Sequence, residues 1–130
     1  MATIEDVQAY LERLDGGVSA DEVEPGLWVL SPEDGGGQIV VNFTPPVVVL
    51  RVNVMELPKD ESRRSALMTK LLELNAKELL HGSYGIEETR VVLTEALQIE
   101  NLDFSELQAS VDSIAMALGS HLAALAPYKE

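Results

Sequence analysis

The sequence predicts an α+β domain in which helices pack on one face of a mainly antiparallel, five-stranded sheet. Segments with apolar residues at helical spacing lie near both ends and in the middle of the chain. Between them, β-rich segments follow one another in runs joined by short links, and do not alternate with helices. The expected order is α-β-β-β-α-β-β-α. Because no repeat or long linker divides the 130 residues, we expect a single domain over 1–130.

The first helix is predicted to begin after Thr3, a residue type suited to the N-cap position. Apolar residues then recur at spacings of three and four: Ile4, Val7, Leu11 and Leu14. Asp6 falls in the first turn, where the helix dipole favours negative charge. We expect Gly16 and Gly17 to end this helix, whose apolar stripe packs on the rest of the domain.

The first run of strands is expected over residues 27–30, 38–44 and 47–55. Pro25 and Gly26 are predicted to open the first strand, and the tract 33–37 to form a hairpin turn before the second. Pro45-Pro46 then reverses the chain before the third. Consecutive strands with short links form an antiparallel meander.

A second helix is predicted after Asp60 or Ser62, ending near residue 75 or 80. Its apolar positions are Leu67, Leu71 and Leu74. Two further strands, 81–87 and 90–99, are expected to follow with a tight turn between them.

The last helix is predicted over 104–125, before Pro127. Asp103 suits its N-cap, and Glu106 three residues later would complete a capping box. Its apolar register consists of Phe104, Leu107, Val111, Ile114, Leu118 and Leu125 and also passes through His121, with Leu122 adjacent to it.

Composition excludes several functional classes. The chain has 22 acidic and 9 basic residues, a net charge of −13, and no cysteine. Nucleic-acid binding depends on Lys and Arg that neutralise phosphates, so no nucleic-acid partner is expected. The same charge would repel an anionic membrane surface. Without cysteine there is no disulfide framework, thiolate zinc site or cysteine nucleophile.

The expected location is the cytoplasm, without membrane contact. Residues 1–6 lack the basic and apolar regions of a secretory signal. The longest aliphatic run, 47–50, is far shorter than the roughly 20 residues of a bilayer span.

Two glycine-containing motifs fail to match the catalytic or phosphate-binding templates that they suggest. In His81-Gly82-Ser83-Tyr84-Gly85 the first glycine adjoins the serine, and the expected helix-to-strand context differs from the strand-to-helix turn of a hydrolase nucleophile elbow. Gly35-Gly36-Gly37 joins two strands and precedes no helix N-terminus, unlike a phosphate-binding loop. We interpret them as a strand with close packing and a hairpin tip.

No catalytic, metal-binding or cofactor-binding residue is predicted. His81 and His121 are forty residues apart and show no metal-ligand spacing. We expect His121 to be a partly buried or interface imidazole, and at a dimer contact it would make association pH-sensitive. Acid pairs such as Glu87-Glu88 fall in turns or at strand ends, where solvated charge is the simplest interpretation; Asp21-Glu22 and Glu33-Asp34 are the others.

The sheet carries the strongest indication of function. In strand 47–55, one face consists of Val48, Leu50, Val52 and Val54. Val47, Val49 and Arg51 lie on the opposite face. If helices cover one side only, several aliphatic groups on the other side stay exposed together with Trp28, and such patches mark interaction surfaces. Burial against a helix or across a dimer is the alternative. Trp28, Val47, Val49 and Arg51 are therefore the candidate protein-binding residues.

The chain also resembles the type III secretion chaperone-like fold, which includes CesT/Tir-type chaperones and the YbjN-like proteins, proposed sensory transduction regulators. The resemblance covers Ile4 to about Leu125. Besides the element order and the small acidic chain, it rests on the helix ending Leu71-Leu72-Glu73-Leu74-Asn75, the strand Gly82-Ser83-Tyr84-Gly85 and the closing helix. It implies a homodimer that binds other polypeptides, with no catalytic residues and no cofactor.

These observations together predict a non-enzymatic, homodimeric, chaperone-like module that holds an apolar segment of a partner polypeptide. The segment would be held by burial in a groove or by strand addition at a sheet edge. The negative charge would keep such a surface soluble and favour a partner with basic flanks. The alternative is a YbjN-like regulatory domain that binds a small ligand or a regulatory partner.

Overall fold

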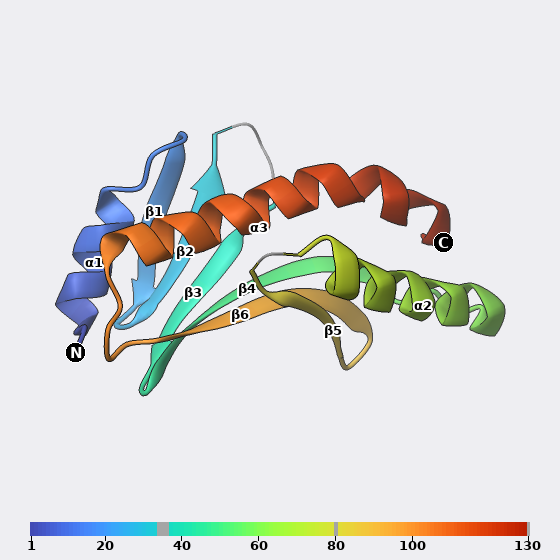
Figure 1. Cartoon of the computed structure of the whole chain (residues 1–130), viewed down its shortest axis with the longest axis horizontal. Coiled ribbons are helices and arrows are strands. Elements are labelled where there is room, and N and C mark those ends of the chain that lie inside the picture. The colour runs from blue at the N-terminus through green and yellow to red at the C-terminus, as the bar shows by residue number, and fades with distance from the viewer. Residues whose placement is uncertain (34–36, 80, 130) are drawn as a thin grey trace.

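A computed structural model describes residues 1–33, 37–79 and 81–129 of the chain (Figure 1). Its elements, in chain order, are α1 (Ile4–Glu12), β1 (Val18–Glu24), β2 (Leu27–Pro32), β3 (Ile39–Thr44), β4 (Val47–Glu56), α2 (Glu61–Lys77), β5 (Ser83–Glu87), β6 (Arg90–Gln98), α3 (Phe104–Leu125) and a short 3₁₀ helix, η1 (Ala126–Tyr128).

The strands form one six-stranded sheet in the order β1-β2-β3-β4-β6-β5, with every neighbouring pair antiparallel. The predicted α+β class is thus confirmed, and the sheet has one strand more than predicted. The added strand, β1, exposes every residue except the half-buried Val18 and Ala20 and carries three acids, so its sequence shows little β-periodicity. Pro25 and Gly26 form the turn between β1 and β2 and do not open the first strand; Gly26 has a φ of 80°.

The predicted N-caps are confirmed for all three helices. Thr3 Oγ1 accepts a hydrogen bond from the Asp6 amide at 3.1 Å, and the Asp6 carboxylate accepts one from the Thr3 amide at 2.9 Å. Asp60 caps α2, and the Asp103 carboxylate accepts from the Glu106 amide at 2.8 Å. That backbone bond is the main cause of the lowered pKa of Asp103.

The end of one helix differs from the prediction. Helix α1 ends at Glu12, one turn before Gly16, so Leu14 lies beyond it. Helix α2 ends at Lys77, within the predicted interval. The predicted hairpin turn over 33–37 falls mostly on residues 34–36, outside the described residues.

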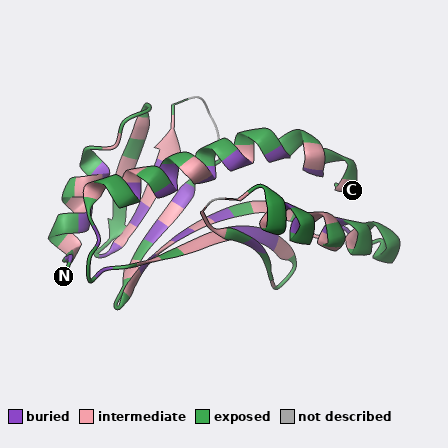
Figure 2. Ribbon diagram, viewed as in Figure 1, coloured by how far each residue is buried: buried purple, intermediate pink, exposed green. Residues whose placement is uncertain are grey.

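One hydrophobic core joins all three helices to one face of the sheet. Figure 2 shows the buried positions on strands and helices where they face each other, and α3 runs across the sheet in Figure 1. The strands contribute Leu30, Val41, Val48, Leu50, Val52 and Leu93, and the helices contribute Val7, Leu11, Leu67, Leu71, Leu107 and Ile114. The predicted core face of β4 is confirmed at three of its residues, while Val54 at the strand's end is half-buried.

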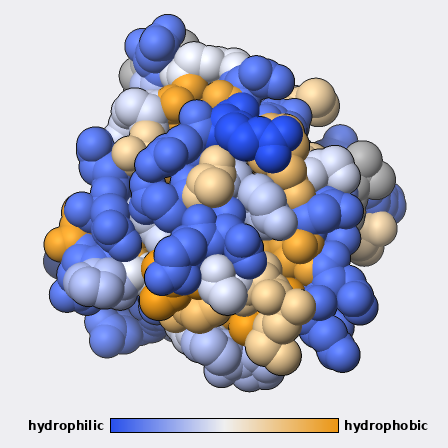
Figure 3. Space-filling model, turned by 90° about the vertical axis from the view of Figure 1, so that its left-hand side faces the viewer, coloured by the Kyte–Doolittle hydropathy of each residue, from blue (hydrophilic) through white to orange (hydrophobic). Residues whose placement is uncertain are grey.

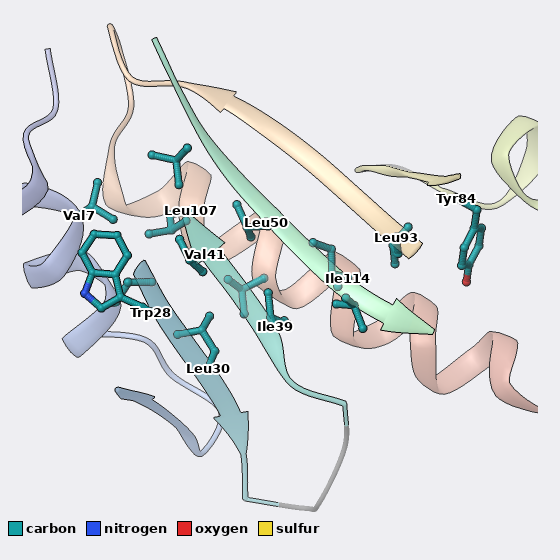
Figure 4. Packing of buried hydrophobic residues seen from close by; sticks show 14 of the residues in the cluster. Val7, Trp28, Leu30, Ile39, Val41, Leu50, Tyr84, Leu93, Leu107 and Ile114 are labelled. Atoms are coloured by element: carbon teal, nitrogen blue, oxygen red, sulfur yellow. The ribbon is translucent and has the colours of Figure 1, made fainter. Parts of the chain in front are cut away.

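Trp28 corrects the predicted set of exposed residues. Its side chain is fully buried, next to Val7 of α1 (Figure 4), and its indole N–H donates to Gln8 Oε1. On β2 it points to the same face as Leu30, which is also fully buried. Trp28 is therefore a core residue and cannot contact a partner directly in this fold.

By length and composition, one helical segment in the described residues, Phe104–Tyr128, would suffice to cross a membrane. In the folded chain its buried side chains, among them Leu107 and Ile114, belong to the shared core.

Candidate binding surfaces

The sheet face without helices carries a belt of half-exposed aliphatic residues. Arg51 of β4 is paired in register with Val40 of β3, which is in turn paired with Val29 of β2. Val49, two residues from Arg51, lies on the same face. The belt consists of Leu27, Val29, Val40, Val47 and Val49, all of intermediate exposure and all outside the core cluster. The structure thus places Val47, Val49 and Arg51 together on the open face and removes Trp28 from it.

An ion pair spans this open face beside the belt. Arg51 on β4 and Glu87 on β5 make two contacts, Nη2–Oε2 at 2.6 Å and Nη1–Oε1 at 3.1 Å. Since β6 lies between β4 and β5, the pair passes across β6. Val92 of β6 lies between the two partners on the same face and is 4% exposed, although it is outside the core cluster. One part of the open face is therefore apolar, and another part is covered by the Arg51–Glu87 ion pair.

The two edge strands differ in how much free backbone they offer. On β5, the Asn75 side chain of α2 accepts from the Tyr84 amide at 2.7 Å and donates to the Tyr84 carbonyl at 3.1 Å. This side chain takes the place that an added strand would occupy at Tyr84. The edge strand β1 carries three exposed acids, Asp21, Glu22 and Glu24. A strand added at β5 would therefore be partly blocked by Asn75, and a strand added at β1 would meet negative charge.

His121 lies inside the fold, where it joins α3 to β5 and to the end of α2. It is 5% exposed, with Nδ1 2.6 Å from the Tyr84 hydroxyl and Nε2 3.4 Å from Glu78 Oε2. Burial, and secondarily the negative charge of Glu78, raise the pKa of Tyr84 to about 12. An open depression of about 290 Å³ lies beside His121, lined by Glu78, Leu79, Ser113, Met116, Ala117 and Ser120.

The glycine motif at 81–85 has a packing role. A Cβ on Gly82 would lie 2.9 Å from the Thr94 carbonyl oxygen, and its φ is 80°, so both contact and conformation favour glycine. Ser83 is exposed at the start of β5, which is the predicted strand context. Gly35 and Gly36 lie outside the described residues.

The polar candidates form no cluster of metal ligands in the residues that the structure describes. Asp21, Glu22 and Glu88 are exposed, as expected of solvated acids. Glu87 is different, because its pairing with Arg51 was not predicted. The absence of a cofactor and of catalysis stays a prediction.

Several exposed apolar side chains lie outside the open face of the sheet, and none of them was predicted as a surface feature. They are Leu72 on α2, Ile86 on β5, and Met116 and Leu122 on α3. Leu122, adjacent to the predicted apolar register of the last helix, is 55% exposed.

The α1 end of the molecule has a second hollow, which is mainly apolar. Figure 3 views this end and shows hydrophobic patches among largely hydrophilic residues. A hollow of about 370 Å³ there is lined mainly by apolar groups, including Met1, Ile4, Phe43 and Pro45.

Comparison with known proteins identifies relatives of this fold. The CesT_Tir_1 family model matches residues 1–130. A chain of the heterodimeric ExoU–SpcU complex, from the type III secretion system of Pseudomonas aeruginosa, superposes with a TM-score of 0.71 at 16% identity, covering 95% of this chain and 98% of that one. No curated protein matches the sequence.

Two further solved structures share the fold. YbjN from E. coli, a proposed transcription regulator, has a TM-score of 0.69 at 15% identity and covers 94% of this chain and 93% of its own. A chain of the HopA1–SchA chaperone–effector complex has a TM-score of 0.58 at 12% identity, over 90% of this chain and 88% of that one.

Proposed function

The chain belongs to the CesT_Tir_1 family, and from this premise we propose that it is a chaperone-like protein that binds an apolar segment of a partner polypeptide. The proposed site is the open face of the sheet, with Val47, Val49 and Arg51 as contact residues. The proposed form is a non-enzymatic, cytoplasmic homodimer of a single domain over residues 1–130, with no nucleic-acid or membrane partner.

One observation carries the proposal: the aliphatic belt on the open sheet face belongs to no core. Five aliphatic side chains there are half-exposed and are not part of the core cluster, whereas most side chains on the opposite face of the same strands are buried. Burying such area against a partner would contribute about 25 cal/mol for each Å² removed from water.

The charge of the chain indicates what the partner segment carries. At a net −13, the protein would attract a segment whose apolar residues are flanked by Lys or Arg. Asp21, Glu22 and Glu24 on β1 lie at the sheet edge where such flanks, or an added strand, would meet negative charge.

The relatives support polypeptide binding as the mode of action. ExoU–SpcU is a heterodimeric complex and HopA1–SchA is a chaperone–effector complex. At 16% and 12% identity these likenesses concern the fold, so the partner of this chain is proposed by its chemistry alone.

A peptide selection tests the proposal. A random peptide library is selected against the wild-type protein and counter-screened against a Val47→Asp/Val49→Asp variant. We expect recovered peptides to combine aliphatic residues with basic flanks and to lose binding to the variant. A control variant, Ser105→Asp, changes an exposed residue of α3 and should keep full binding. Peptides that bind wild type and the Val47→Asp/Val49→Asp variant equally would contradict the proposed site.

The depression beside His121 favours a second candidate, binding of a small ligand. It places a buried imidazole, the Glu78 carboxylate and the Ser113 and Ser120 hydroxyls around about 290 Å³. Convergent polar groups in a part-apolar hollow are typical of small-molecule sites. A thermal-shift screen with metabolites would support this candidate if a hit were lost in a Ser113→Leu variant, which fills the hollow.

A further inference from the structure

The open face of the sheet carries opposite charges on either side of the aliphatic belt. Asp21 on β1 is paired in register with Val29 on β2. Val29 is paired with Val40 on β3, which is paired with Arg51 on β4. Residues directly opposite each other in antiparallel strands point to the same face, so these four side chains form one row across the strands. The row begins with an exposed acid, passes over two half-exposed valines and ends at a cation.

The cationic end of this face consists of Arg51 and Arg90, which are the basic residues of the described strands. Arg90 of β6 is paired in register with Glu87 of β5, and it lies on the same face as Val92, two residues along its own strand. Glu87 is close to both guanidinium groups: its Oε1 is 3.1 Å from Arg51 Nη1 and 3.9 Å from Arg90 Nη2. One carboxylate is thus shared by two arginines.

Arg90 has hydrogen-bonding capacity that this contact does not use. A guanidinium group carries five N–H donors, and 3.9 Å is longer than a hydrogen bond. The Nε atoms of Arg90 and Arg51 are both buried without a hydrogen-bond partner among the described residues. Glu56, the acid paired in register with Arg90 on β4, accepts a hydrogen bond from Thr89 Oγ1 at 3.2 Å. Two guanidinium groups that share one carboxylate can bind a second one through charge-assisted hydrogen bonds.

We propose that the partner segment lies across the strands on the open face, with an Asp or Glu side chain bound by Arg51 and Arg90, aliphatic residues on the belt, and a basic residue at Asp21. This arrangement rests on the proposed function and deepens it, because it assigns an acid to the partner and places the partner's basic flank at the β1 end. Adjacent strands are about 4.8 Å apart, so β1 and β4 are separated by about 14 Å, the length of about four extended residues. The basic and acidic residues of an extended segment are therefore expected at least about four residues apart.

Charge complementarity favours a segment with both signs of charge over a uniformly basic one. The net charge of −13 attracts basic segments to the protein as a whole. A Lys or Arg placed at Arg51 and Arg90 would face two guanidinium groups, and like charges brought together at an interface lower affinity. The two arginines would therefore select among basic apolar segments those that also carry an acid.

A double-mutant cycle on peptide binding tests the role of the acid. A peptide from the selection against wild-type protein is compared with versions in which each Asp or Glu is replaced by Asn or Gln. We expect one such replacement to weaken binding to the wild-type protein about tenfold and to have little effect on binding to Arg90→Gln, where the carboxylate has lost its partner. Arg90→Gln leaves the Arg51–Glu87 contacts in place, so its thermal unfolding should stay close to that of wild type. Lys59→Gln removes an exposed cation next to α2 and, as the matched control, should keep the tenfold difference.

The outcomes separate failure of this inference from failure of the proposed function. Peptides that depend on Val47 and Val49 but carry no acid overturn the inference alone. The same holds if every acid-to-amide replacement weakens binding to Arg90→Gln as much as binding to wild type. Peptides that bind the Val47→Asp/Val49→Asp variant unchanged contradict the proposed site and this inference with it. If a second copy of the chain covers the open face, Arg90→Gln changes the sedimentation coefficient and no peptide is recovered, which overturns both.

Discussion

Arg51 of β4 and Glu87 of β5 form a two-point ion pair, with Nη2–Oε2 at 2.6 Å, across the intervening strand β6. Both side chains are partly solvated, at 42% and 37% exposed, so the pair itself contributes little to stability. The ion pair also covers the side chain of Val92 on β6, which is 4% exposed. Because its guanidinium is already paired, Arg51 would meet a partner chiefly through its aliphatic stem, or by exchanging Glu87 for an acid of the partner.

Arg51→Ala should therefore lower the free energy of unfolding by about 1 kcal/mol, from a weak ion pair and from newly exposed Val92. Arg51→Met keeps most of the stem and should lose less. Urea titration of both variants measures this. Equal losses of unfolding free energy in the two variants would show that covering Val92 does not contribute to stability.

Trp28→Ala should destabilise the fold by about 3–5 kcal/mol, because it leaves a large cavity between α1 and the sheet. Val49→Ala, on the open face, should cost less than about 1 kcal/mol. Thermal and urea unfolding distinguish the two sites. A small effect at Trp28 would contradict its assignment to the core.

Asn75→Ala should leave the Tyr84 amide and carbonyl without partners at the edge of β5. We expect a loss of about 1–2 kcal/mol and much faster hydrogen exchange at the Tyr84 amide. Asn75→Asp keeps the acceptor for that amide and should retain most of the protection. If hydrogen exchange at the Tyr84 amide were unchanged in Asn75→Ala, the Asn75 side chain would not protect the backbone at this edge.

The raised pKa of Tyr84 predicts a loss of stability in alkali. Its folded value of about 12 exceeds the ordinary value of 10.0, so the folded state binds the phenolic proton more tightly than the unfolded state. The contribution is fully present below pH 10 and declines as the pH rises toward 12, by on the order of 2 kcal/mol in total. Tyr84→Phe cannot titrate, so the difference between the two unfolding curves isolates this term. Parallel curves from pH 9 to 12 would contradict it.

Elements with strong local signals were predicted from sequence. The three helices have apolar residues at helical spacing and capping side chains at their starts, and β4 has a clear alternation, so element types, caps and the two faces of that strand are confirmed. Strand β1 was missed because its acidic residues suit an exposed sheet edge and carry no periodic apolar signal.

The errors and omissions at the candidate site have tertiary causes. Leu27-Trp28-Val29-Leu30 is apolar on both faces, so alternation could not decide that Trp28 points to the core. Arg51 and Glu87 are 36 residues apart, and Asn75 and Tyr84 are on different elements. These contacts depend on the strand order β4-β6-β5 and on the position of α2, which no local pattern reports.

Methyl NMR of valine-labelled protein, titrated with a peptide from the selection, tests the central claim most directly. The account predicts that the methyl resonances of Val29, Val40, Val47 and Val49 shift on binding, while the buried Val7 and Val48 on the helix-covered side move little. Shifts confined to the core valines or to the surroundings of His121, with the open-face valines unmoved, would contradict it.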